Sequence, residues 1–336
     1  MKVVVTGASG HVGAALVRAL LARGEQVRVV AHPETNMPAS LAGLDVDSVV
    51  GDVCYLPSLR SAFSGCEIVF HLAGLISIDG DRDGKVRRVN VDGAGNAASA
   101  ALASGVRRFV HMSSVHAFDH HPVDAPLDES RARPGAAHPA YDRSKAEGEV
   151  AVRAVVAQGL DAVIVNPSGI IGPLDFAPSR MGQVLLYLAQ RKLPGLSGGG
   201  FDWVDVRDVA SGVMAAAERG RTGQNYLLSG HYATVADVAR MAAEITGVPA
   251  PRLVAPAVIE DVAAVVSTAW SRLRGQRPHL TREALHALRG SRNINGARAA
   301  AELGHAPRPT KETIADAYAW FVAQGRLPEL RERLAQ

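Results

Sequence analysis

The stretch "VVVTGASGHVGAALVRALLARG", residues 3–24, decides the fold class of this chain. A run of β-branched residues is followed at once by three glycines, Gly7, Gly10 and Gly13, and then by an amphipathic helical pattern. Glycines at these positions let the turn tighten, let a pyrophosphate approach the backbone and let the helix pack closely on the strand. The helix N-terminus would face the phosphate charge. The stretch therefore predicts a strand-turn-helix unit that binds a dinucleotide.

The alternation of strand and helix continues to about residue 166. Short apolar runs predict strands, and the longer stretches between them predict helices. The predicted strands are 2–7, 26–30, 47–53, 67–74, 107–114 and 162–167, and the predicted helices are 14–24, 59–65, 93–105 and 141–158. This order predicts an α/β fold with a doubly wound parallel sheet of the Rossmann type.

The rhythm changes after Pro167, where loops rich in Gly and Pro separate helical stretches. Near the end, residues 310–325 place Ile314, Tyr318 and Phe321 on one helix face. We therefore expect a dinucleotide-binding domain over 1–166, which also uses part of 201–228, and a smaller, mainly helical substrate domain over 167–336.

The composition disfavours several classes of protein. The 36 Lys and Arg against 33 Asp and Glu leave a net charge of +3 without a polybasic tract, so nucleic-acid and membrane-surface binding have little support. Two cysteines, Cys54 and Cys66, provide neither a zinc site nor a disulfide framework. Residues 255–270 are apolar but interrupted by Glu260 and Asp261, which predicts a packed helix and not a membrane span. We expect a cytoplasmic protein.

A second stretch, "PAYDRSKAEGEV" at residues 139–150, carries the candidate chemistry. On a helix, Tyr141 and Lys145 share one face. An ammonium near a phenol stabilises the phenolate, so we expect Lys145 to lower the pKa of Tyr141 toward working pH. Tyr141 could then act as a general acid or base.

The TGxxGxxG spacing of the first turn resembles the extended short-chain dehydrogenase/reductase family. Further motifs follow in the family's order: "GDV" at 51–53, "HLAG" at 71–74, "NVDG" at 90–93, "MSS" ending at Ser114, the Tyr141–Lys145 pair and "NPSGIIGP" at 166–173. The resemblance implies a catalytic set of Asn90, Ser114, Tyr141 and Lys145, with Ser113 as the alternative serine. It implies cofactor contacts at Gly7, Ser9, Gly10, His11, Val12, Gly13, His32, Asp52, Val53, Leu72, Ala73, Gly74, Tyr141, Lys145, Pro167 and Gly169.

The cofactor subtype depends on the end of the second predicted strand. NAD-preferring relatives tend to carry an aspartate there, and NADP-preferring relatives often carry an arginine. This chain has neither, and His32 takes the place of the arginine. An imidazole beside a phosphate favours its protonated form, so we expect NADP, with NAD as the alternative. The other interpretation of His32 is an exposed turn residue.

A histidine-rich loop follows the candidate serine and raises the question of a metal. His116, His120 and His121 lie in it, with Asp119 and Asp124 nearby. Metal ligands must converge, and the family places substrate contacts here and uses no metal, so we expect no metal site. We expect His116 to line the substrate site and His120 and His121 to be exposed.

Three reactions are open to the family's catalytic set. Dehydration is disfavoured because Val115, His116 and Ala117 offer no acid pair after the serine. "NPSGIIGP" looks like the dihydroflavonol reductase and hydroxysteroid dehydrogenase branches, whose substrates are apolar ketones or alcohols. We therefore expect an NADP-dependent oxidoreductase, active as a homodimer, that acts on a carbonyl or alcohol of an apolar small molecule. The alternatives are a nucleotide-sugar epimerase and, from another class, a dinucleotide-sensing protein. Leu174, Phe176, Met181, Leu185 and Tyr187 either line an apolar pocket or pack in a helix core.

Overall fold

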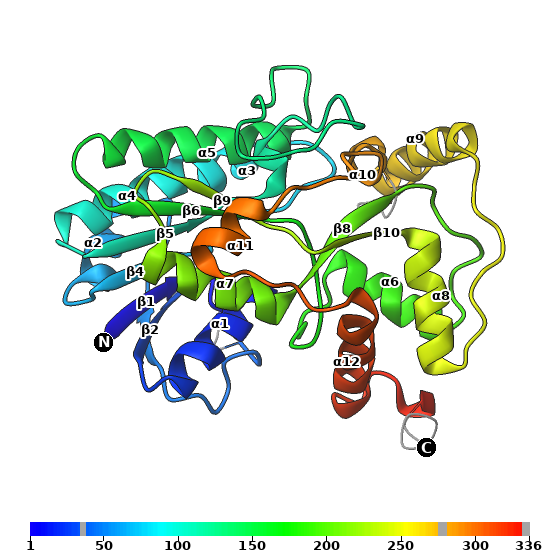
Figure 1. The fold of residues 1–336 in the computed structure, drawn as a ribbon, viewed down its shortest axis with the longest axis horizontal. Helices are drawn as coiled ribbons and strands as arrows, with labels where there is room; N and C mark the ends of the chain where they lie inside the picture. Colours follow the sequence, from blue (N-terminus) through cyan, green and yellow to red (C-terminus); the bar gives the residue numbers. More distant parts are fainter. Residues whose placement is uncertain (34–37, 275–280, 331–336) are drawn as a thin grey trace.

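A seven-stranded parallel sheet organises the first part of the computed structural model, which describes residues 1–33, 38–274 and 281–330 (Figure 1). Its strand order is β3-β2-β1-β4-β5-β6-β9. The strands are β1 (Lys2–Thr6), β2 (Gln26–Ala31), β3 (Asp47–Val50), β4 (Ile68–His71), β5 (Arg108–Met112), β6 (Ala162–Pro167) and β9 (Asn225–Leu228). The predicted Rossmann-type sheet is confirmed, and β9 extends it beside β6.

Helices cover both faces of this sheet. On one face, α1 (His11–Ala22) packs beside α7 (Val206–Arg219), and on the other lie α2 (Leu56–Phe63), α4 (Gly93–Ala103) and α5 (Ala140–Val156). Successive side chains of β1 point to opposite faces of the sheet. Val3 and Val5 therefore pack in the apolar cluster on one face, and Val4 packs in the cluster on the other. The strand order reverses between β1 and β4, so a crevice is expected at their carboxyl ends.

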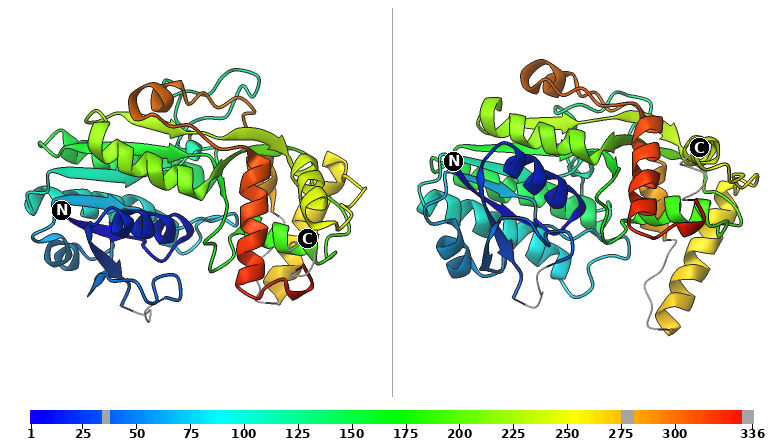
Figure 2. Two further views of the ribbon diagram at one scale, coloured as in Figure 1. Left: turned by 60° about the horizontal axis from the view of Figure 1, so that its bottom comes forward. Right: turned by 90° about the horizontal axis from the view of Figure 1, so that it is seen from below.

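A second layer beyond β6 contains a three-stranded sheet that the sequence did not predict. Its strands are β7 (Gly169–Ile171), β8 (Gly200–Asp205) and β10 (His231–Thr234), in the order β10-β8-β7. Three helices pack beside this small sheet (Figure 2). They are α6 (Arg180–Ala189), α8 (Val235–Thr246) and α12 (Thr310–Ala323). The predicted domain boundary at residue 166 stays a prediction.

The remaining elements are short or lie at the periphery. They are α3 (Lys85–Arg87), the π-helix η1 (Arg88–Asp92), the 3-10 helices η2 (Val115–Ala117) and η3 (Pro328–Leu330), α9 (Ala257–Leu273), α10 (Arg282–Leu288) and α11 (Ala297–Leu303).

Two predicted helices near the C-terminus have different outcomes. In α12 the predicted face is buried, because Ile314, Tyr318 and Phe321 have no exposed surface. The helix predicted over 255–270 forms as α9. Val258 and Val266 are exposed, so the prediction that this helix packs closely against the protein is wrong. Within the described residues, no helix is long and apolar enough to cross a membrane.

Candidate active site

The glycine turn after β1 is built for close contact with the backbone. Gly7 has a φ of +68°, and a Cβ there would lie 2.6 Å from the amide nitrogen of Ala73. A Cβ on Gly13 would lie 2.3 Å from the carbonyl oxygen of Gly7, so only glycine lets α1 approach the turn. Gly10 is the N-cap of α1 and provides no side chain to cap its amides. The cradle therefore fits a dinucleotide pyrophosphate, which those amides would bind.

The flanks of this turn are exposed or anchored to a neighbouring loop. Ser9 and Gly10 are exposed, whereas Val12 is buried under the turn. His11 is partly buried, and its Nε2 lies 2.8 Å from the carbonyl oxygen of Pro173. The imidazole of His11 thus ties the start of α1 to the loop after β7.

The other predicted cofactor residues follow neighbouring strands of the same sheet. His32 comes directly after β2 and is exposed. The Asp52 carboxylate, after β3, accepts a hydrogen bond from the amide of Cys54 at 2.8 Å, and the carbonyl of Val53 accepts one from Asn96 at 3.0 Å. Because all these strands are parallel, their carboxyl ends meet at one edge. The structure thus brings together at this edge the glycine turn, His32, Asp52, Val53, Leu72, Ala73, Gly74 and Ser114.

Tyr141 and Lys145 lie one turn apart on α5, as the sequence predicts. The Lys145 Nζ donates to the carbonyl oxygen of Met112 at 3.3 Å and lies 6.0 Å from the centre of the Tyr141 ring. A Cβ on Gly74 would lie 3.2 Å from the same Nζ, so glycine leaves room for the ammonium at the end of β4. The ammonium therefore lies between the tyrosine and the cofactor edge.

Asn90 lies on the π-helix η1 and uses its amide to position backbone. Its Oδ1 accepts from the amide of Leu75 at 2.7 Å, and its Nδ2 donates to the carbonyl of Leu75 and to the Ser144 hydroxyl, both at 2.9 Å. These bonds join the segment after β4 to α5. In this structure Asn90 acts on the site through those two segments.

The two serines after β5 differ in what their hydroxyls contact. The Ser114 Oγ accepts from the amide of His116 at 3.2 Å, and the Ser114 hydroxyl also acts to lower the pKa of Tyr141. Ser113 is buried, and its Oγ has no hydrogen-bond partner among the described residues. The geometry favours Ser114 as the partner of Tyr141.

Burial dominates the protonation of both residues of the pair. Burial raises the pKa of Tyr141 to about 12, and the Ser114 hydroxyl offsets part of this increase. Burial lowers the pKa of Lys145 to about 8, opposed by the carboxylate of Glu149. The expectation that Lys145 lowers the pKa of Tyr141 toward working pH is therefore wrong for this structure. Desolvation of the phenolate outweighs attraction to an ammonium 6.0 Å from the ring.

A polar network behind the pair was missed by sequence analysis. Glu149, only 1% exposed, pairs with Arg133 at 2.9 Å and accepts from Asn166 at 2.7 Å and Asn225 at 2.9 Å. Asn166 also donates to the backbone carbonyl of Ser114 at 2.9 Å. One signal was present in the sequence, since Glu149 continues the four-residue spacing of Tyr141 and Lys145 along the same helix face.

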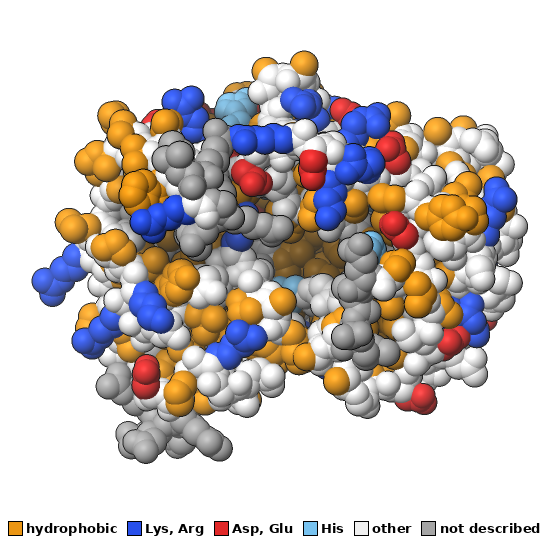
Figure 3. Space-filling view, turned by 180° about the vertical axis from the view of Figure 1, so that it is seen from behind, with side chains coloured by type: hydrophobic (Ala, Val, Ile, Leu, Met, Phe, Trp, Pro, Cys, Tyr) orange, Lys and Arg blue, Asp and Glu red, His pale blue; other side chains and the backbone are white. Residues whose placement is uncertain are grey.

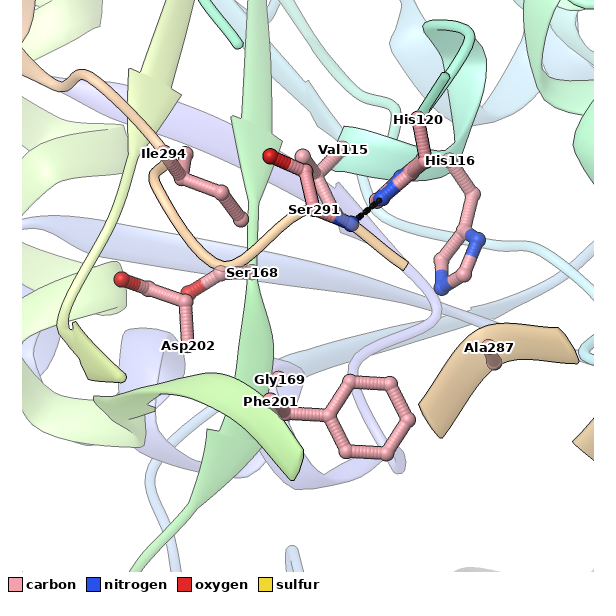
Figure 4. A pocket seen from close by; sticks show the side chains of 10 residues that line it. All are labelled: Val115, His116, His120, Ser168, Gly169, Phe201, Asp202, Ala287, Ser291 and Ile294. Carbon is pink, nitrogen blue, oxygen red and sulfur yellow. Dashed lines mark hydrogen bonds between the residues drawn. The ribbon is translucent and has the colours of Figure 1, made fainter. Parts of the chain in front are cut away.

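A small cavity of about 40 Å³ opens beside His116 (Figure 4), and His116 in turn contacts Tyr141. His116 connects the two, because it lines the cavity while its ring lies 5.7 Å from the Tyr141 ring, and its Nδ1 lies 3.2 Å from the Asp142 carboxylate. The predicted exposure of His120 was wrong. It is 8% exposed and its Nδ1 accepts from the amide of Ser291 at 3.1 Å. The cavity is lined by Val115, His116, His120, Ser168, Gly169, Phe201, Asp202, Ala287, Ser291 and Ile294.

The apolar residues downstream of Pro173 mostly pack in cores and do not line this cavity. Leu185 is 1% exposed in the core of the second layer, and Met181 packs against the same cluster. Leu174 packs against the core of the large sheet, and Phe176 contacts the ring of Trp320. Of the two interpretations of these residues, core packing holds for Leu174, Met181 and Leu185. Elsewhere, the far face of the molecule is hollowed near its centre, with apolar side chains on the floor of the hollow (Figure 3).

Comparison with known proteins now decides the family. Residues 3–229 match the model of the NAD dependent epimerase/dehydratase family, which is more than half of the chain. The chain belongs to that family. It is accordingly an enzyme of the NAD(P)-dependent, extended short-chain dehydrogenase/reductase type and an oxidoreductase.

Relatives within the family include several reductases. The chain is 37% identical over 330 residues to sterol demethylase protein B of Methylococcus capsulatus, covering 97% of this chain and 100% of that protein. It is 34% identical to a putative dihydroflavonol 4-reductase of Synechocystis, covering 96% and 94% of the two chains. The crystal structure of gox2253 superposes with a TM-score of 0.81 at 34% identity, covering 97% of this chain and 99% of that one.

Proposed function

We propose that this oxidoreductase reduces a ketone or aldehyde of a largely apolar small molecule, or oxidises the corresponding alcohol, with NADP as its cofactor. The observation that carries the proposal is the position of Tyr141. Its ring lies 6.0 Å from the Lys145 Nζ and 5.7 Å from the ring of His116, which lines the cavity. A reacting carbonyl next to the phenol would be within reach of the hydroxyls of Tyr141 and Ser114.

Each member of the catalytic set has a task that follows from its position. When bound, the nicotinamide supplies or accepts the hydride. Ser114 donates a hydrogen bond to the substrate oxygen, and Tyr141 transfers the proton. A phenol whose pKa is raised to about 12 is protonated at neutral pH, which suits a proton donor in reduction. Lys145 would bind the cofactor ribose and orient the cofactor beside the tyrosine.

The lining of the cavity supports the proposed substrate class. Val115, Phe201 and Ile294 provide apolar contacts, whereas His116 and Asp202 provide polar ones. Such a mixture suits the oxygen-bearing end of an apolar molecule, the part that a cavity of about 40 Å³ could hold. The names of relatives point the same way, since they include a sterol demethylase protein and, at 34% identity over 77% of this chain, the cinnamoyl-CoA reductase 1 of rice.

The test of the proposed reaction is net consumption of cofactor. The purified protein is screened with NADPH over ketones and aldehydes, and absorbance at about 340 nm, a property of the reduced nicotinamide, is followed together with alcohol formation. One NADPH should be consumed for each alcohol formed. Interconversion of two sugar nucleotides without added cofactor would replace the reductase by the epimerase. A homodimer and a cytoplasmic location stay predictions.

A further inference from the structure

Three ligand-type side chains converge outside the catalytic set, on the loop that leads from η2 into α5. They are Asp119, His121 and His138, and one potential ligand atom from each lies within 4.8 Å of the others. The Asp119 Oδ1 lies 3.5 Å from the His121 Nδ1 and 3.2 Å from the His138 Nε2. Convergence is the property that metal ligands require, and the sequence alone showed it for no set of residues in this loop.

The two spacings to Asp119 suit a metal ion. At metal–ligand distances of about 2.0–2.1 Å, tetrahedral ligand atoms lie about 3.3 Å apart, close to both values for Asp119. Two imidazole nitrogens and one carboxylate oxygen form a donor set that zinc and its neighbours in the first transition row accept. Three protein ligands would leave one coordination position open.

The surroundings hold two of the three groups in place. The amide of Asp119 donates to the carbonyl of Ala132 at 2.7 Å, which fixes the backbone beneath the carboxylate. The Nδ1 of His138 accepts from the amide of Gly135 at 3.0 Å and lies 3.3 Å from the carbonyl oxygen of the same residue. Metal binding at Nε2 would move the imidazole proton to Nδ1, where the Gly135 carbonyl would accept it in place of the amide contact.

The neighbouring helix faces the same point. On α10, the ring of His286 lies 5.7 Å from that of His121 and 6.5 Å from that of His138. The guanidinium of Arg131 donates to the backbone carbonyls of Asp119 and Pro122 and not to the Asp119 carboxylate. The Asp119 Oδ1 accepts from the amide of His121 at 2.9 Å and faces both imidazoles. We propose that Asp119, His121 and His138 form a binding site for a divalent transition-metal ion such as zinc. A bound ion would tie together the two ends of the loop beside the cavity.

Zinc binding to the metal-free, full-length protein, without a histidine tag, tests the proposal. Calorimetric titration with zinc alone should show one ion per chain. Removing a ligand should weaken binding at least about tenfold in His138→Ala and in Asp119→Asn, because even outer contacts to metal ligands are worth 10- to 100-fold. His231→Ala is the matched control, since His231 is exposed and its ring contacts the carbonyl of Pro307, away from the loop.

A second measurement separates loss of the site from loss of the fold. The melting temperature of the wild type should rise when zinc is added, and that of His138→Ala should not, while both melt alike without metal. A cobalt-loaded wild type should also show visible d–d absorption that the variant lacks. Absence of zinc binding by the wild type, or equal affinity in the wild type and both ligand variants, would overturn the proposal. The imidazoles would then simply be hydrogen-bond donors to Asp119.

Discussion

The cofactor edge and the cavity wall lie side by side but are assembled differently. At the cofactor edge, each functional segment follows directly on a strand of one parallel sheet, as residues 7–13, 52–53 and 72–74 do. The cavity wall joins segments from the loop after β5, the second sheet and the α10 region, such as His120, Phe201 and Ser291. A parallel sheet makes neighbours of its strand ends automatically, whereas the wall exists only once the second layer has packed.

The largest effect should come from Tyr141, which lies where the two regions meet. We expect Tyr141→Phe to lower kcat by about 100-fold or more, because the proton donor is lost, with cofactor affinity nearly unchanged. Steady-state kinetics and calorimetry with NADPH check both values. Tyr55→Phe is the control, since Tyr55 is 61% exposed. Turnover above about a tenth of the wild-type value would remove Tyr141 from its role.

The cavity wall should give the protein a specific sensitivity to acid through His120. Burial lowers the pKa of His120 to about 3, so the folded protein resists the proton that the unfolded chain binds near pH 6.5. Stability therefore falls as pH falls below about 6.5, by about 2 kcal/mol between pH 7 and pH 5 from this residue. His120→Asn keeps an acceptor for the amide of Ser291. In urea titrations, the free energy of unfolding of this variant should fall by about 2 kcal/mol less than that of the wild type between pH 7 and pH 5. An unchanged loss in the variant, with His231→Asn as control, would contradict the burial of a neutral His120.

Disturbing the polar network behind the Tyr141–Lys145 pair through Glu149 should have a smaller effect on activity. Replacing its charge in Glu149→Gln breaks the pair with Arg133 and alters the contacts of Asn166, which holds the Ser114 backbone. We expect kcat/KM to fall by about tenfold, because a small displacement of catalytic groups is costly. The exposed neighbour Glu147→Gln is the matched control. Equal activity of the two variants would limit the network to a structural role.

The smallest effect concerns cofactor choice at the end of β2. We expect the wild type to bind NADP more tightly than NAD, and His32→Asp to reverse this preference. One added charge about 4 Å from a phosphate is worth about 1 kcal/mol in water, or about fivefold in affinity. Calorimetry with both cofactors measures it. Tighter NAD binding by the wild type would instead make the enzyme NAD-dependent.

How much the sequence predicted differs between the two regions for a physical reason. The glycine turn and the helical spacing of Tyr141 and Lys145 were predicted from local patterns, because each pattern stays within one strand-turn-helix unit or one helix. Asn90 was predicted from the family resemblance alone. The burial of His120 was not predicted, since Ser291, which contacts it, comes 171 residues later in the chain.

The misjudged pKa and the missed sheet have related causes. Spacing along a helix shows that Tyr141 and Lys145 are neighbours, but the cost of burying a phenolate depends on everything packed around it. The three short strands β7, β8 and β10 lie in loops rich in Gly and Pro, and they pair across long distances in sequence. Periodicity in a short window carries no signal for either feature.

The central claim is that hydride passes from the cofactor to a substrate that leaves as an alcohol. NADPH carrying deuterium at the transferred position of its nicotinamide tests it most directly, with the product analysed by mass spectrometry and NMR. The account predicts one deuterium on the carbinol carbon of the product and one oxidised cofactor per product molecule, with both signals lost in Tyr141→Phe. Turnover that leaves the deuterium on the cofactor and yields an isomer of the substrate, without any need for free NADPH, would contradict it.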